Sequence, residues 1–279
     1  MSRMAVESTT MHLPLHGKSI EVAIHSLPST TGTILLLHEA LGSVSYWKDF
    51  PRKLALATGS NVLTYSRPGH GHSEGPLEMR SEKHYMDQVQ VVIPALLRHF
   101  SVSCPVVYGH SEGASIAMLY AATCGGVEAL VLESPFVIAE RSSSTVIGKM
   151  AAAYPGSKLQ NRLAQYHLNP DAVFHAWANW AGNLAAGAAP LPGVLAQIVC
   201  PVLVLQGADD EFGSILHLQA IKSAIADVQH ECFPNTGHLP HRERTDLVLN
   251  RVGRFLADTR RFAIGCEPVA LSDLCEDQP

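Results

Sequence analysis

The stretch Pro-Val-Val-Tyr-Gly-His-Ser-Glu-Gly-Ala-Ser-Ile-Ala-Met-Leu-Tyr at residues 105–120 contains a short apolar run, a turn and a helical segment in immediate succession. The run before Gly109 is typical of a buried strand, and the alanine-containing segment after Gly113 is typical of a helix. A serine at the centre of such a turn needs small neighbours, because larger ones would clash where strand and helix approach each other. The stretch therefore predicts a Ser111 side chain that is pushed out beyond the edge of a sheet.

Apolar runs of the same kind recur along the chain and alternate with helical segments. The expected strands are 10–15, 19–27, 33–37, 61–66, 104–109, 127–133, 201–206 and 229–233. The expected helices are 48–58, 81–100, 111–124, 213–226 and 240–258. Runs of four to seven apolar residues bounded by Gly, Pro, Asn or Cys are typical of strands that are buried on both faces. This order predicts an α/β fold with a mostly parallel eight-stranded sheet and helices on both faces.

One connection is out of proportion to the others. Residues 135–199 separate two expected strands, where a simple crossover needs only about 10–12 residues. Helical stretches in this segment are interrupted by sequence rich in Ser, Gly and Pro. We expect residues 137–192 to form a small helical cap over the carboxyl edge of the sheet. Residues 1–136 and 193–258 would then form the core, and residues 259–279 a loosely held tail.

Further motifs follow other strands. One apolar run ends in Gly-Ala-Asp209-Asp210, and the next is followed by Pro-Asn-Thr-Gly-His238. The loop 38–43 reads His-Glu-Ala-Leu-Gly-Ser. Together with the Gly-x-Ser-x-Gly turn, these motifs resemble those of the α/β-hydrolase superfamily. The resemblance covers roughly residues 10–258 and is specific for the fold and the catalytic set, but not for the substrate.

The resemblance implies that Ser111 is a nucleophile, Asp210 its supporting acid and His238 its base, in the chain order of that superfamily. The imidazole would take the serine proton as Oγ attacks a carbonyl carbon, and the carboxylate would hold the useful tautomer. Backbone amides of Glu112 and Ala40 would hold the oxyanion. No metal ion or organic cofactor is expected.

Alternatives remain for two of these positions. Asp209 lies one residue from Asp210, and Glu133 ends the strand before the cap, where some members of the superfamily carry the acid. His241 is the alternative base, and otherwise it is expected to cap a helix or to lie at the surface. The run Ser-Arg-Pro-Gly-His-Gly-His-Ser at 66–73 resembles the superfamily's R-x-G-x-G-x-S turn, which is structural; it is not expected to bind phosphate or a metal ion.

The pocket is less sharply defined by the sequence. Glu39, which stands where the superfamily usually has glycine, and His110 are expected to line it together with Trp177 and Trp180 of the cap. With Phe174, the tryptophans recur at three-residue spacing, so they fit equally well as one helix face buried against the core.

Composition bounds the partners of the chain. Of its 279 residues 47% are hydrophobic and 16% charged, and the formal net charge is −5. The absence of a basic stripe argues against nucleic acid. The first residues have no signal-peptide pattern and no apolar run is long enough to cross a bilayer, so we expect a cytoplasmic protein with no membrane partner. The six scattered cysteines are expected to be thiols. A small molecule is the expected ligand, and a homodimer is left open.

The expected function is hydrolysis of an ester or related carbonyl bond in a small, fairly apolar substrate, through an acyl-enzyme on Ser111. Hydrolysis of a C–C bond or a lactone by the same residues is the alternative. A cofactor-free oxygenase, a perhydrolase and a ligand receptor are further uses of the same fold.

Overall fold

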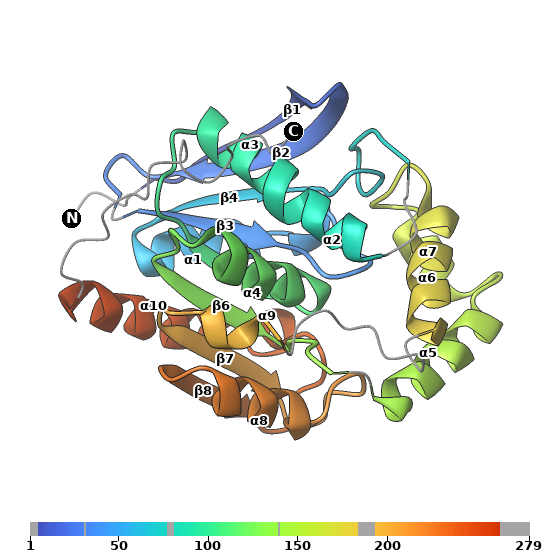
Figure 1. The fold of residues 1–279 in the computed structure, drawn as a ribbon. Helices are drawn as coiled ribbons and strands as arrows, with labels where there is room; N and C mark the ends of the chain where they lie inside the picture. Colours follow the sequence, from blue (N-terminus) through green and yellow to red (C-terminus); the bar gives the residue numbers. More distant parts are fainter. Residues whose placement is uncertain (1–4, 31, 77–80, 139, 184–192, 263–279) are drawn as a thin grey trace, which may run out of the picture.

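A central sheet of eight strands organises the described part of the molecule (Figure 1). The computed structural model describes residues 5–30, 32–76, 81–138, 140–183 and 193–262. The strands are β1 (Glu7–Leu15), β2 (Lys18–Ser26), β3 (Thr33–Leu37), β4 (Asn61–Tyr65), β5 (Val106–His110), β6 (Ala129–Glu133), β7 (Val202–Gly207) and β8 (Val228–Phe233). Their order across the sheet is β1-β2-β4-β3-β5-β6-β7-β8.

The sheet is parallel from β4 to β8 and antiparallel at its first edge. Strand β2 pairs antiparallel with both β1 and β4, and every later pairing is parallel. The first two strands form a hairpin that turns at His16 and Gly17, both of which have positive φ. The expected mostly parallel eight-stranded sheet is confirmed. Strand ends differ from the expected ones by up to three residues.

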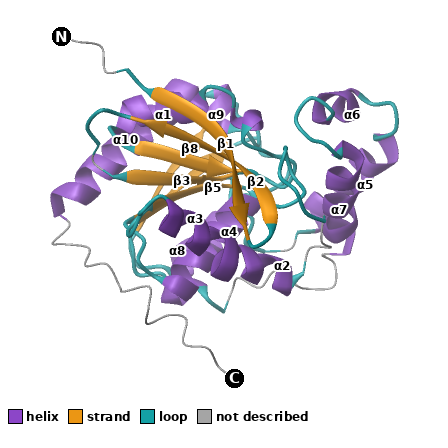
Figure 2. Cartoon of the chain, turned by 90° about the horizontal axis from the view of Figure 1, so that it is seen from above, coloured by secondary structure: helices purple, strands orange, loops and turns teal. Residues whose placement is uncertain are grey.

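Helices cover both faces of the sheet (Figure 2). They are α1 (Phe50–Thr58), α2 (Glu82–Asp87), α3 (Ile93–His99), α4 (Glu112–Cys124), α5 (Arg141–Ala153), α6 (Lys158–Leu163), α7 (Pro170–Asn183), α8 (Ile215–Ala224), α9 (Pro240–Glu243) and α10 (Thr245–Phe262), with short 3-10 turns at Ser45–Trp47 and Leu195–Gln197. Helices α1 and α10 pack on one face with Ile34 and Leu36, whereas α3, α4 and α8 pack on the other with Leu35 and Leu37. Alternate residues of β3 therefore enter two different cores, as expected for a strand buried on both faces.

Two expected helices are broken in the structure. The segment 81–100 is not one regular helix, because a π-helical turn at Gln88–Val92 separates α2 from α3. This wider turn lies just before Pro94, which has no amide to donate to the preceding turn. The segment 240–258 is divided into α9 and α10 at Arg244, whose guanidinium binds the carbonyl oxygen of Asn235.

The end of the chain differs from the expectation as well. Helix α10 continues to Phe262, so the tail does not begin at residue 259; residues 263–279 lie outside the described part. Cys104 is disulfide-bonded, which contradicts the expectation of thiols only, whereas Cys124, Cys200 and Cys232 are thiols. Among the residues that the structure describes, no helix is both long and apolar enough to cross a bilayer.

Helices α5, α6 and α7 come between β6 and β7 in the chain, and we call them the cap. Figure 1 shows them beyond the end of the sheet at which the parallel strands finish. Their apolar side chains form a cluster of their own, which also includes Ala40 and Leu41 from the loop after β3. A histidine between α6 and α7 joins the cap to the core: His167 accepts a hydrogen bond from the amide of Gly71 (2.9 Å) and its other ring nitrogen donates to Leu41 O (2.9 Å).

Candidate active site

The turn between β5 and α4 carries Ser111 in a strained backbone conformation. Its φ of 54° and ψ of −116° lie where a side chain usually costs about 1–3 kcal/mol. Glycines make this turn possible. A Cβ on Gly109 would lie 2.3 Å from the carbonyl oxygen of Gly113, and a Cβ on Gly113 would lie 2.2 Å from that of Leu37. Because neither position has room for a side chain, strand and helix meet closely and Ser111 projects from the edge of the sheet.

His238 and Asp210 form a close pair on neighbouring loops, after β8 and β7. Nδ1 of His238 lies 2.9 Å from both carboxylate oxygens of Asp210. The carboxylate also accepts hydrogen bonds from the amide of Phe212 (2.9 Å) and the side-chain amide of Gln206 (2.8 Å). A carboxylate can only accept, so Nδ1 of His238 carries the proton and Nε2 is left as the basic nitrogen.

Charge and burial act in opposite directions on this pair. Burial favours a lower pKa for His238, but the hydrogen bond and charge of Asp210 outweigh it, and with Glu39 and Glu211 they raise the pKa of His238 above its ordinary value. Burial favours a higher pKa for Asp210, but the donors around it, His238 foremost, lower it. The pair therefore stabilises a proton on the imidazole.

Ser111 and His238 both line one cavity of about 300 Å³. No hydrogen bond joins the two side chains among the described residues. Hydrogen bonds between catalytic groups are often long without substrate and shorten in the complex, so this does not separate the two residues functionally.

The alternative candidates for the acid, Asp209 and Glu133, and for the base, His241, are placed differently. Asp209 is exposed, and its amide donates to Thr236 O. Glu133 is fully buried and accepts from Tyr108 Oη (2.6 Å) and from the amide (2.7 Å) and Nδ1 (2.9 Å) of His241. His241 is 2% exposed, so the expectation of a surface residue is wrong. The side chain is buried because the carboxylate of Glu133 supplies its partner.

His110 also differs from its expected place. It is not among the residues that line the cavity; its ring is 1% exposed and Nε2 donates to the carbonyl oxygen of His238 (2.8 Å). The residue before the nucleophile points behind the site because successive side chains of β5 alternate in direction. There it supports the backbone of His238 instead of the pocket wall.

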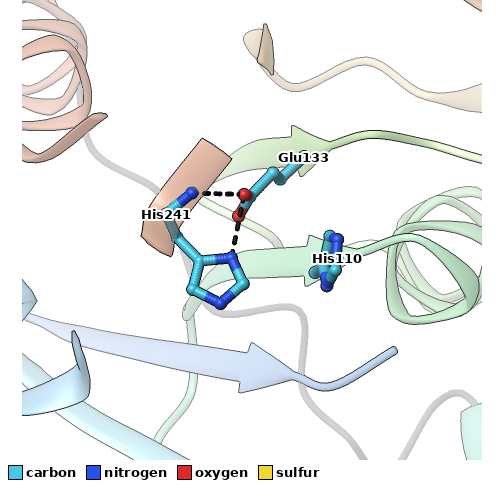
Figure 3. A group of neighbouring side chains, drawn as sticks. All are labelled: His110, Glu133 and His241. Atoms are coloured by element: carbon cyan, nitrogen blue, oxygen red, sulfur yellow. Dashed lines mark hydrogen bonds and ion pairs between the residues drawn. The ribbon is translucent and has the colours of Figure 1, made fainter. Parts of the chain in front are cut away.

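His110, Glu133 and His241 together have metal-ligand atoms within 4.8 Å of one another (Figure 3). Figure 3 shows the ring and the amide of His241 directed at the carboxylate. Burial lowers the pKa of His110 to about 3, so its ring is neutral. Burial favours a higher pKa for Glu133, but the interaction with His241 and the hydrogen bonds from His241 and Tyr108 outweigh burial and lower the pKa to about 2. Three donors already occupy this carboxylate, so the geometry is that of a hydrogen-bonded network.

The backbone positions expected to hold an oxyanion belong to residues that line the same cavity as Ser111. Ala40, in the loop after β3, and Glu112, the first residue of α4, both line the cavity. The N-terminus of a helix carries a partial positive charge that favours a developing anion. Glu39 also lines the cavity, and its carbonyl oxygen accepts from the amide of Gly42 (3.1 Å).

The cavity wall is mostly apolar, and the cap supplies much of it. Its apolar lining from the cap consists of Val146, Ile147, Met150, Leu159, Leu163, Trp177 and Trp180. The core adds Leu41, Tyr46, Tyr85, Phe136, Phe212 and Leu239, together with the carboxylates Glu39, Glu211 and Glu243. Trp177 is 9% exposed and also belongs to the apolar cluster of the cap, so it faces both the cavity and the interior. Trp180 is half-buried and lies beside Tyr85 and Phe136.

Phe174 differs from these tryptophans in its surroundings, although its ring contacts that of Trp177. It is fully buried and stacks on Tyr154 with ring centroids 3.6 Å apart, and it does not line the cavity. Sequence reasoning missed Phe212, whose ring lies 4.9 Å from that of His238, and Arg67, which is buried beside the loop of Ala40. The position of Phe212 two residues after Asp210 was the available signal for the first; the arginine of the 66–73 turn was the signal for the second.

Known proteins match almost the whole chain. The profile of the Alpha/beta hydrolase family matches residues 34–251. A Haemophilus influenzae protein named "Putative esterase/lipase" is 22% identical over an aligned length of 271 residues, and the match covers 89% of this chain and 92% of that protein. A serine hydrolase of Cycloclasticus zankles has a similar structure with a TM-score of 0.75, at 17% identity over 90% of this chain and 98% of the other. For an esterase of Exiguobacterium antarcticum the TM-score is 0.71, at 16% identity over 89% and 100%. With its sheet order, its serine turn and the match of most of its length, the chain belongs to the α/β hydrolase family.

Proposed function

We propose that this protein is a serine hydrolase that cleaves esters through an acyl-enzyme on Ser111, and that the acyl group of its substrate is small, uncharged and fairly apolar. The observation that carries the proposal is the pairing of Asp210 with His238, which lines the same cavity as a serine on a strained turn. The names of the Haemophilus and Exiguobacterium relatives, both of which mention an esterase, support the same class of reaction.

The reaction proceeds in two halves. Nε2 of His238 takes the proton of Ser111 as Oγ bonds to the carbonyl carbon, and the carbonyl electron pair moves to its oxygen. The amides of Ala40 and Glu112 hold this oxyanion. When it collapses, the bond to the alcohol breaks and the alcohol leaves with the proton from His238. Water then repeats the sequence on the acyl-enzyme, releasing the acid and restoring Ser111.

The role of Asp210 follows from its bonds. It holds His238 with the proton on Nδ1 and stabilises the imidazolium that forms in each half. The network of His110, Glu133 and His241 lies behind the same loop and supports its backbone. The apolar wall of the cavity excludes water from the oxyanion and accommodates the acyl or alcohol group.

The test is covalent labelling with a fluorophosphonate probe, followed by peptide mapping. We expect labelling at Ser111 and none in Ser111→Ala, together with hydrolysis of p-nitrophenyl butyrate by the unsubstituted protein only. A folded protein that neither labels nor hydrolyses any ester would favour a ligand receptor. Labelling without ester turnover would favour the alternatives, a C–C bond or lactone hydrolase, or a cofactor-free oxygenase or perhydrolase.

A further inference from the structure

Arg67 occupies the centre of a buried network beside the proposed oxyanion site. It follows β4 in the turn 66–73 and is 1% exposed. Its guanidinium donates to the carbonyl oxygens of His38 (2.6 Å) and Glu39 (2.8 Å), and to the carboxylate of Glu112 (2.7 Å). Glu112 is one of the two residues whose amides we propose as oxyanion donors, and Glu39 directly precedes the other, Ala40. Through Arg67, the turn 66–73 therefore contacts the proposed oxyanion site. Its resemblance to a structural motif did not imply this contact.

On the β3 side, Arg67 holds the donor peptide itself. The carbonyl of Glu39 and the N–H of Ala40 belong to the same planar trans peptide group, so they point in opposite directions. The bond from Arg67 to this carbonyl therefore helps to fix the direction of the Ala40 N–H, together with the bonds that the same oxygen accepts from the amide of Gly42 (3.1 Å) and from Nδ1 of His38 (2.6 Å). It also polarises the peptide, since hydrogen bonds in a chain strengthen one another. Ala40 lines the cavity, which is where that N–H has to act.

On the α4 side of the site, Arg67 pairs with the carboxylate of Glu112, the first residue of that helix. The Glu112 side chain is 5% exposed, and Tyr85 Oη donates to its second oxygen (3.1 Å). Glu112 follows the nucleophile directly, so its side chain holds the start of the helix at the guanidinium. One rigid fork of donors thus connects both proposed donors of the oxyanion site.

Stabilisation of the fold does not by itself explain a buried ion pair such as Arg67–Glu112. Removing two charges from water costs free energy that their attraction often fails to recover, and apolar replacements of similar size are frequently neutral or stabilising. We propose, on the basis of the function proposed above, that Arg67 is a positioning residue that holds the Glu39–Ala40 peptide and the N-terminus of α4 at the separation required by an oxyanion.

Three variants test this role. Arg67→Lys keeps the charge opposite Glu112 but loses the planar fork that reaches both carbonyls. The double variant Arg67→Met/Glu112→Met removes the pair without leaving a buried charge. Arg260→Lys is the matched control, because Arg260 also pairs with a carboxylate, Glu128 (2.6 Å), on a part of the core away from the cavity.

The measurements separate transition-state from ground-state effects. In Arg67→Lys and in the double variant, kcat for p-nitrophenyl butyrate should fall about 10- to 100-fold, less than the roughly 10²- to 10³-fold cost of removing an oxyanion donor outright, because the donors are displaced and not lost. KM should change less than about 3-fold, because the fork does not contact ground-state substrate. The inhibition constant of an alkyl trifluoromethyl ketone, which forms an oxyanion when Ser111 adds to it, should rise in parallel with the loss of kcat/KM. Arg260→Lys should change none of these.

Several outcomes would overturn the proposal. The first is that the unsubstituted protein hydrolyses the ester and that the kcat of Arg67→Lys and of the double variant stays within about 3-fold of its kcat. A second is a rise of KM in place of the fall of kcat, or a trifluoromethyl ketone affinity that does not follow kcat/KM. Loss of the cooperative thermal transition in both variants would assign the pair to folding alone. A protein that is inactive and unlabelled before any substitution would instead contradict the proposed function.

Discussion

Nδ1 of His238 lies 2.9 Å from both carboxylate oxygens of Asp210, although the two residues are 28 positions apart in the chain. Close backbone packing makes this approach possible: a Cβ on Gly207, at the end of β7, would lie 2.1 Å from the carbonyl oxygen of Gly237. The loop that carries Asp210 and the loop that carries His238 are therefore in direct contact just before each residue.

Because Asp210 is the carboxylate that binds Nδ1 of His238, substitutions at the three candidate residues should identify the acid of the catalytic set. Asp210→Asn should lower kcat about 10⁴-fold, as in a comparable triad, because an amide does not hold the imidazole in the required tautomer. Asp209→Asn should remain within about 2-fold. Glu133→Gln should mainly lower stability, by about 1–3 kcal/mol, because it weakens bonds to a buried network. Parallel ester kinetics and thermal melts of the three variants decide this, and a larger kinetic loss at Asp209 or Glu133 would transfer the acid role there.

The pH dependence follows from the raised pKa of His238. Only the neutral imidazole can take the proton of Ser111, so kcat/KM should fall as the pH falls through the pKa of the free enzyme. Because that pKa lies above 6.5, the midpoint of the acid limb should also lie above 6.5. In Asp210→Asn burial still lowers the pKa of His238, but the carboxylate that raised this pKa is gone. The midpoint of the acid limb should therefore move to lower pH, and the maximal kcat/KM should decrease. A midpoint below 6.5 in the unsubstituted protein would contradict this assignment of the base.

What the sequence predicts well is what local sequence determines. The turn at Ser111 requires Gly109 and Gly113 within a few residues, so the motif itself encodes the geometry. The parallel sheet follows from runs of apolar residues, each of which is complete within a single strand. Ser111, Asp210 and His238 follow β5, β7 and β8, which run in the same direction, so they lie at the same edge of the sheet; their catalytic roles stay a prediction.

What the sequence does not reveal is pairing between distant residues. His241 was expected to cap a helix or to lie at the surface, but it is buried against Glu133, which is 108 positions away. Arg67 was assigned to a structural turn by the resemblance of 66–73 to the R-x-G-x-G-x-S motif, and its partner Glu112, 45 positions away, was not foreseen. Whether a polar residue is buried depends on such a partner, and a single sequence does not show it.

Carboxylates in the cavity should make the protein discriminate against anionic substrates. Glu39, Glu211 and Glu243 line it, and Arg162 is the only arginine or lysine among its described lining residues. We expect kcat/KM for p-nitrophenyl butyrate to exceed that for the mono-p-nitrophenyl ester of succinate by roughly 10-fold, about 1.4 kcal/mol, a Coulomb energy expected of charges near a protein surface. Glu211→Gln should narrow the ratio and Arg162→Gln should widen it, and added salt should narrow it as well. A ratio near one at low salt would contradict this prediction.

The last prediction concerns the two tryptophans of α7, which differ in their surroundings although both line the cavity. Trp180→Ala should enlarge the cavity and move the preferred acyl chain of p-nitrophenyl esters about two carbons longer, because each methylene in an apolar pocket changes selectivity by about 1–3 kcal/mol. Trp177→Ala should also lower the melting temperature, since Trp177 packs against Phe174 and Phe212 (ring centroids 5.8 and 6.3 Å). Phe174→Leu is the matched control: it removes contacts from the same cluster but not from the cavity wall, so it should lower the melting temperature and leave the acyl-chain profile in place. A profile from acetate to decanoate that is the same in both tryptophan variants and in the unsubstituted protein would show that the tryptophans stabilise the cap without shaping the pocket.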